Sequence, residues 1–204
     1  MTTAKQIVDF CRQHNIHFVF AESCTGGKLA AAIVDVPGAS DVFHGSLVTY
    51  SDGMKMAVLD VEGYTLGRFS AVSEIVAHQM AYGALHLLRD TFSHTQPDVE
   101  PRCFTVSTTG YVGPFTDENR HAFIGLAGFF ASQENSYSGF APAVHEITFK
   151  TDDRQGNQQA VVERALQEIV TMLEKATQDS NTEARAWTDA NGNLHARNLP
   201  SGKD

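Results

Sequence analysis

The residue types best suited to chemistry lie in one stretch, Ala21-Glu22-Ser23-Cys24-Thr25-Gly26-Gly27, which separates an apolar run from a helix-favouring run. The hydroxyl groups of Ser23 and Thr25 are potential nucleophiles. Backbone N–H groups at the start of the following helix, near Gly26 and Gly27, can hold an anion or an oxyanion. The alternative is that a hydroxyl only caps the helix and that the glycines only permit the turn. Spacing alone leaves both interpretations open.

A candidate base lies in the hexapeptide Tyr50-Ser51-Asp52-Gly53-Met54-Lys55. If Tyr50 ends a strand and Lys55 lies one turn into a helix, the amine can reach back to the edge of the sheet. A lysine serves as a base only when it is neutral, and lowering its pKa from about 10.4 to about 7.5 costs roughly 4 kcal/mol, which desolvation can supply. Tyr50 can then orient the amine or relay its proton. The alternative is that Lys55 is a solvated surface amine, as most lysines are.

A second turn with hydroxyl groups and glycines, Thr108-Thr109-Gly110-Tyr111-Val112-Gly113-Pro114, follows another apolar run. Two such turns after two strands are consistent with one shared pocket at the carboxyl edge of a sheet. The nine histidines are a rival source of a base, but none has a metal-binding spacing such as HExxH. The chain contains no GxxxxGK[ST] loop and no GxGxxG after a strand, which disfavours kinase, NTPase and dinucleotide-redox functions. We expect neither a metal nor a cofactor.

The periodicity predicts an α/β fold that places these turns. Helices are expected over 3–14, 29–34, 54–59, from 73 onward and over 157–176, and strands over 16–20, 43–50, 103–107, 122–130 and 144–150. Helices alternate with strands except between the last two strands, so the sheet is predicted to be mixed and mostly parallel. Residues 1–176 are expected to form one domain, and residues 177–204 a polar tail in which Trp187 is the one large apolar anchor.

Composition narrows the classes of partner. The chain has 204 residues, 42% of them hydrophobic, and a formal net charge of −9. That acidity disfavours a nucleic-acid groove or an anionic membrane surface, since both require clustered Lys and Arg. The sequence has no amino-terminal signal and no apolar run long enough to span a membrane, and its three cysteines lie far apart. We expect a cytoplasmic protein that binds neither nucleic acid nor membrane.

Several motifs together resemble the CinA carboxy-terminal domain family, over roughly residues 4 to 175. They are the stretches at 21–27, 36–40, 50–55, 71–74, 80–84 and 109–114. The resemblance implies a three-layer αβα sandwich that often self-associates, so a homodimer is expected. It also implies a metal-independent amidohydrolase of pyridine-nucleotide salvage, which converts nicotinamide mononucleotide to nicotinic acid mononucleotide and ammonia. Longer relatives carry an additional amino-terminal domain, and we expect this chain to be the stand-alone form.

The resemblance and the residue chemistry together suggest a division of roles. Ser23 would attack the carboxamide carbon, Lys55 would take its proton and later protonate the departing ammonia, and Tyr50 would support the lysine. The residues expected to bind the pyridine nucleotide are Thr25, Gly26, Gly27, Thr109, Gly110 and Arg154.

The chain departs from the family pattern around the second turn. Tyr111-Val112 replaces the usual Ile-Ala, Phe115-Thr116 replaces two glycines, and the segment 120–125 also differs. Near the last helix Arg154 is followed by Asn157, where the family shows a second arginine. Two alternatives therefore stand beside the deamidase. One is a catalytically silent module that binds a pyridine nucleotide or a partner, and the other is an amidase for a non-phosphorylated amide.

Overall fold

The structure is a computed structural model that describes residues 2–95, 102–115, 119–131, 137–183, 187–188 and 194–195. The chain forms two compact units, Met1–Val170 and Thr171–Asp204.

The first unit is built on one five-stranded sheet in the order β2-β1-β3-β4-β5. The strands are β1 (Ile16–Glu22), β2 (Phe43–Val48), β3 (Arg102–Gly110), β4 (His121–Ala131) and β5 (Tyr137–Thr148). β1 pairs in parallel with both β2 and β3, whereas β4 is antiparallel to β3 and to β5. All strands except β4 therefore point the same way, which confirms the prediction of a mixed, mostly parallel sheet.

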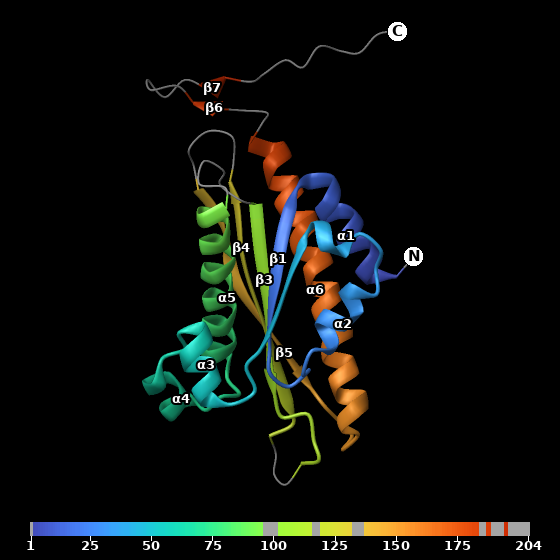
Figure 1. Cartoon of the computed structure of the whole chain (residues 1–204), viewed down its shortest axis with the longest axis vertical. Helices are drawn as coiled ribbons and strands as arrows, with labels where there is room; N and C mark the ends of the chain where they lie inside the picture. The colour runs from blue at the N-terminus through green and yellow to red at the C-terminus, as the bar shows by residue number, and fades with distance from the viewer. Residues whose placement is uncertain are drawn as a thin grey trace. The chain divides into compact units, whose positions relative to one another are not determined.

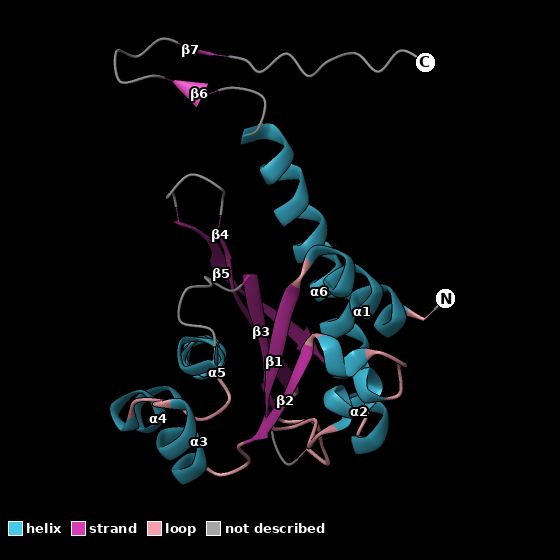
Figure 2. Cartoon of the chain, turned by 45° about the horizontal axis from the view of Figure 1, so that its top comes forward, coloured by secondary structure: helices cyan, strands magenta, loops and turns pink. Residues whose placement is uncertain are grey.

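Helices cover both faces of this sheet, as Figures 1 and 2 show. One face carries α1 (Thr3–His14), α2 (Lys28–Val34) and the first part of α6 (Arg154–Glu183). The other face carries α3 (Asp52–Leu59), α4 (Gly63–Phe69) and α5 (Glu74–Thr95). A short 3₁₀ turn, Ala39–Asp41, precedes β2. The three-layer αβα architecture implied by the resemblance is confirmed.

Four differences between the structure of the first unit and the sequence-based elements are the largest. Helix α4 was not predicted, because its two glycines give Gly63–Phe69 a low helix propensity, and burial of Leu66 in the core stabilises it instead. Strand β3 continues to Gly110 through its pairing with β4, so Thr109 and Gly110 lie in a strand and not in a turn. Strand β5 and helix α6 also begin earlier than predicted, and α6 extends beyond the expected end near Ala176.

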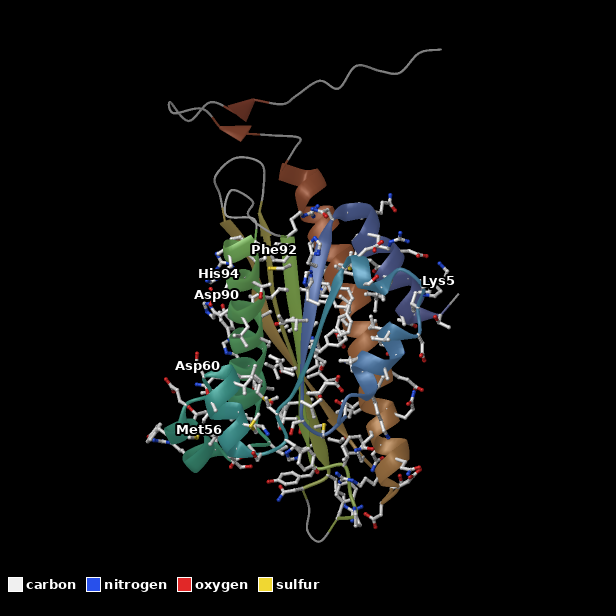
Figure 3. The ribbon with its side chains drawn as sticks, viewed as in Figure 1. Lys5, Met56, Asp60, Asp90, Phe92 and His94 are labelled. Carbon is white, nitrogen blue, oxygen red and sulfur yellow. The ribbon has the colours of Figure 1, made fainter. Side chains whose placement is uncertain are left out.

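Alternation along β1 directs its side chains to the two faces of the sheet. Val19 and Ala21 belong to the core beneath α5, together with Phe92. Figure 3 shows Phe92 pointing from α5 toward the sheet, while Asp90 and His94 lie on the outer side of that helix. By the same alternation, Ser23 is directed to the α3–α5 side and Glu22 to the α2 side.

Helix α5 approaches the sheet unusually closely. Two hydroxyls of β3 donate to its backbone carbonyls, from Thr105 Oγ1 to Ala81 O at 2.7 Å and from Ser107 Oγ to Ala77 O at 2.5 Å. Gly125 makes room for this contact, since a Cβ there would lie 2.6 Å from Ala77 O. The buried hydroxyls thus find partners, and α5 is fixed in position beside the end of β1.

The second unit contains the end of α6 and one antiparallel strand pair, β6 (Trp187–Thr188) and β7 (Leu194–His195). Docking of the Trp187 side chain, which the sequence suggested, lies outside what the structure describes. The division into a domain of residues 1–176 and a tail of residues 177–204 stays a prediction. Among the described helices, none is long and apolar enough to cross a membrane.

Candidate active site

Ser23 lies immediately after β1, at the carboxyl edge of the parallel strands. Its side chain is buried, with 7% exposure, and its backbone N–H donates to Thr108 O at 2.9 Å. Lys55 comes from α3, one turn after Ser51, whose hydroxyl caps that helix by accepting from Met54 N. The sheet edge and the start of α3 therefore bring together two residues that are 32 positions apart in the sequence.

The amine of Lys55 contacts three oxygen atoms. Its Nζ lies 3.1 Å from Ser23 Oγ, 3.0 Å from Thr49 O and 3.3 Å from Tyr50 O. A neutral amine has two N–H groups and one lone pair, so it can donate to the two carbonyls while its lone pair accepts the Ser23 hydroxyl proton. This is the arrangement that a lysine base requires.

Burial makes the neutral form of Lys55 accessible. Only 1% of the residue is exposed, and desolvation lowers the pKa of its amine, with Asp52 and Cys24 opposing part of that effect. The surface-amine interpretation of Lys55 is therefore wrong. Its side chain is among the largest that are fully buried in the described part of the chain.

We expect the rate of any reaction that uses this base to rise with pH. Because the pKa of Lys55 is lowered, the rise should occur below the pKa of an exposed lysine, about 10.4. The measurement is kcat/KM for amide hydrolysis as a function of pH. A profile that stays flat from pH 5 to about 10 would contradict a lysine base that must lose its proton.

Tyr50 contacts the lysine through its backbone and not through its phenol. The carbonyl of Tyr50 accepts from Lys55 Nζ, whereas its hydroxyl accepts from Arg154 Nη2 at 2.9 Å. The tyrosine side chain is exposed (62%). A supporting role for the Tyr50 side chain stays a prediction. The contact with Lys55 in the structure comes from the main-chain carbonyl of Tyr50.

Ser23 and Lys55 open into a cavity of about 330 Å³. Three of the predicted binding residues line it, namely Thr109, Gly110 and Arg154. Thr109 Oγ1 donates to Ala71 O at 2.7 Å, and Arg154 Nη1 donates to Gly113 O at 2.6 Å. Both residues are thus held in place at the cavity wall.

The other three predicted binding residues do not line this cavity. Thr25 is buried, and its hydroxyl contacts Glu22 and Thr108. The backbone N–H of Gly26 donates to Ser23 O, and that of Gly27 donates to the Glu22 carboxylate. These amides are already paired within the chain, so an oxyanion contact from them stays a prediction that requires their present bonds to be replaced.

Sequence reasoning assigned no role to several residues that build the site. The carboxylate of Glu22, Gln158 Nε2 (2.7 Å from Cys24 O) and Asn157 Nδ2 (3.1 Å from Val112 O) all brace the turns around Ser23 and Arg154. Asn157 therefore holds backbone at the position where the family pattern has a second arginine. One signal for Glu22 was present in the sequence, since an acidic residue lies directly before a turn and a helix start.

The altered loop supplies an aromatic wall. Phe115 and Tyr111 line the cavity. The ring of Phe115 stacks on Phe149 and lies under the Arg120 guanidinium, 4.8 Å from its centroid. Thr116, the second replaced glycine, lies outside the described residues.

Comparison with known proteins shows what the chain is similar to. The family model described as the CinA C-terminal domain matches residues 1–173. A CinA-like protein of Chlorobium limicola is 34% identical over 168 residues, covering 80% of this chain and 35% of that protein. One of Petrotoga mobilis is 44% identical over 95 residues, covering 47% of this chain and 21% of that protein. The chain thus spans only about a fifth to a third of the length of these curated relatives.

Solved structures agree with the sequence comparison. The competence/damage inducible protein CihA from Agrobacterium tumefaciens has a TM-score of 0.65 and 28% identity, covering 83% of this chain and 93% of that one. A CinA superfamily protein from Enterobacter cloacae has a TM-score of 0.66 and 26% identity, covering 84% and 90% respectively.

Proposed function

We propose, from the premise that this chain belongs to the family of CinA C-terminal domains, that it is an amidohydrolase acting on nicotinamide mononucleotide. The products are nicotinic acid mononucleotide and ammonia. The observation that carries the proposal is the buried Lys55 amine at 3.1 Å from the Ser23 hydroxyl, beside a cavity. A nucleophile within hydrogen-bond reach of a base that is itself oriented by further groups is typical of covalent acyl transfer.

The proposed reaction proceeds in two halves. Ser23 Oγ forms a bond to the carboxamide carbon while its proton passes to Lys55 Nζ. The C–N bond then breaks, Lys55 returns the proton to the nitrogen, and ammonia leaves an ester on Ser23. Water attacks this ester and gives a proton to Lys55, and the same proton returns to Ser23 Oγ as the acid is released. The carbonyls of Thr49 and Tyr50 hold the amine throughout.

None of these steps requires a metal ion, and we propose that the activity is metal-independent. In the described ranges, no three His, Cys, Asp or Glu side chains gather as a metal site. Activity that survives treatment with EDTA would support this part of the proposal, and activity lost to EDTA and restored by a divalent metal would contradict it.

Arg154 is the residue we propose for the phosphate of the substrate. It lines the cavity, and it has no carboxylate partner among the described residues. Charge-assisted hydrogen bonds to such a cation contribute about 1.5–3 kcal/mol each. The aromatic side chains of Tyr111 and Phe115 line the same cavity and can face the pyridine or ribose.

Substitution Arg154→Gln should raise KM for nicotinamide mononucleotide by roughly tenfold or more, because it removes one such contact. KM for nicotinamide riboside, which lacks the phosphate, should change much less. The measurement is the ratio of the two kcat/KM values. Arg164→Gln is the matched control, since Arg164 also lies on α6 but does not line the cavity and pairs with Glu168 at 2.6 Å. An unchanged preference for the nucleotide in Arg154→Gln would contradict the assignment.

A second candidate, an amidase for a non-phosphorylated amide, is favoured by one observation. Asn157 stands where the family pattern has a second arginine, and its amide is used on Val112 O and Thr151 O. A wild-type protein that hydrolyses the riboside as well as the nucleotide would support this candidate. Ammonia release from neither compound would favour the catalytically silent module.

We also propose that the protein acts in the cytoplasm as a homodimer, and sedimentation of the purified chain tests the dimer.

A further inference from the structure

Among the described residues around the site, Glu22 has the side chain with the most hydrogen bonds, and the proposed reaction does not use it. The residue is fully buried, with 0% exposure. Its Oε2 accepts from the Thr25 hydroxyl and from the backbone N–H groups of Gly27 and Leu29, at 2.8, 2.9 and 3.1 Å. Its Oε1 accepts from Ala30 N at 3.0 Å and from Ser46 Oγ at 2.8 Å. Two oxygen atoms thus receive five donors.

These bonds close the turn that carries Ser23. They tie the end of β1 to Thr25, to the backbone on either side of the α2 start, and to β2 through Ser46. A carboxylate at a helix amino terminus is also stabilised by the helix dipole. The segment that begins at Glu22 is therefore bonded at its far end, Leu29, to the Glu22 carboxylate, and Ser23 lies between these two residues.

Glu22 also reaches the other half of the dyad through its backbone. Its carbonyl accepts from Thr49 N at 2.9 Å, and the carbonyl of Thr49 accepts from Lys55 Nζ at 3.0 Å. The residue thus holds the turn of Ser23 with its side chain and the partner of Lys55 with its main chain. Neither contact places Glu22 in the cavity, because it is not among the lining residues.

We propose that Glu22 is a positioning residue, whose buried carboxylate holds the Ser23 hydroxyl within reach of Lys55; the role rests on the proposed function. The carboxylate accepts from the backbone N–H groups of Gly27, Leu29 and Ala30 at the start of α2. It acts through the geometry of the turn and not by contact with the substrate.

Substitution Glu22→Gln is the sharpest perturbation, because the side chain keeps its size. The remaining oxygen can serve the three donors at the Oε2 position. The new NH₂ group then faces Ala30 N–H and the Ser46 hydroxyl, and only the hydroxyl can turn to accept. One donor therefore opposes another at the start of α2, which should loosen the turn.

The test measures the placement of the nucleophile without using the substrate. In Ser23→Cys, a thiol stands beside Lys55, which can take its proton and stabilise the thiolate as an ammonium ion, so the thiol pKa should lie below that of the neighbouring buried Cys24 thiol. The rate of alkylation by iodoacetamide as a function of pH reports that pKa. Burial raises the pKa of both Cys11 and Cys24 to about 12, so these thiols should react slowly, and alkylation of the wild type is subtracted.

Adding Glu22→Gln to Ser23→Cys should move the midpoint of this pH profile upward by roughly one unit, because the thiol leaves the lysine. In the otherwise wild-type chain, Glu22→Gln should lower kcat by about 10-fold to 100-fold with KM little changed, as expected for a misplaced nucleophile. An unchanged pH profile in the folded double variant would overturn the proposal.

Glu62→Gln is the matched control, since Glu62 also stands at a helix start and accepts from Thr65 and Gln79, but does not line the cavity. It should change neither the pH profile nor kcat.

If Glu22→Gln does not fold, Thr25→Val is used instead, because it removes one hydrogen-bond donor to Glu22 Oε2. The proposal then again requires the midpoint of the alkylation profile to shift to higher pH. Failure of the wild type to release ammonia would refute the proposed function, whereas the alkylation profile reports separately whether Glu22 holds the residue 23 side chain beside Lys55.

Discussion

Substitution Ser23→Ala should lower kcat for ammonia release from nicotinamide mononucleotide by roughly 10⁴-fold, since no covalent intermediate can form without the hydroxyl. The fold should survive, because Lys55 Nζ keeps its contacts with Thr49 O and Tyr50 O. KM or the Kd for the nucleotide should change little, since the hydroxyl contributes to the reaction more than to binding. The measurements are steady-state ammonia release and far-UV circular dichroism.

Ser93→Ala is a suitable control for this substitution. Ser93 is exposed on α5, and its hydroxyl donates only locally, to Arg89 O at 3.1 Å. Its removal should leave kcat within about twofold, as is usual for surface changes away from a site. A Ser23→Ala protein that retains more than about a tenth of wild-type turnover would rule out Ser23 as the nucleophile.

Substitution Lys55→Met should lower kcat by roughly 10²-fold to 10⁴-fold, the range that one general base contributes. Methionine fits the buried channel of the lysine stem but can neither accept the Ser23 proton nor return it to the leaving group. The rise of kcat/KM with pH should disappear together with the activity. Lys5→Met, on an exposed residue that projects outward from α1 (Figure 3) and pairs with Asp9, is the control and should behave as wild type.

The same lysine makes a prediction about stability. Because the pKa of Lys55 is lowered in the folded state, the unfolded chain binds more protons between the folded pKa and about 10.4. The contribution of Lys55 to stability therefore rises with pH across that window and is constant below the folded pKa. Urea titrations at several pH values should show this contribution in the wild type and lose it in Lys55→Met. Identical pH dependence in both proteins would argue against a buried lysine with a lowered pKa.

Much of the site followed from the sequence. Spacing offered Ser23 after an apolar strand and Lys55 one turn into a later helix but left other interpretations open, and the family resemblance decided for the pair, whose side chains meet in the structure. The parallel core of the sheet followed from the alternation of helices and strands. The mixed, mostly parallel sheet is confirmed. The catalytic roles of Ser23 and Lys55 stay predictions.

Other parts of the site depend on register and tertiary contact, which no local pattern reports. Glu22 points away from Ser23 because neighbouring residues of β1 face opposite sides, and its bond to Ser46 depends on the pairing of β1 with β2. The support of Lys55 by the carbonyl of Tyr50, and not by its ring, depends on how the chain enters α3. Helix α4 forms through burial despite a weak propensity.

The central claim is that the Ser23–Lys55 pair hydrolyses a carboxamide, and one assay addresses it most directly. Purified wild-type protein is incubated with nicotinamide mononucleotide in the presence of EDTA, and ammonia and nicotinic acid mononucleotide are both quantified over time. The account predicts that the two products appear in equal amounts and that neither forms with Ser23→Ala. A folded wild-type protein that binds the nucleotide and releases neither product would contradict it.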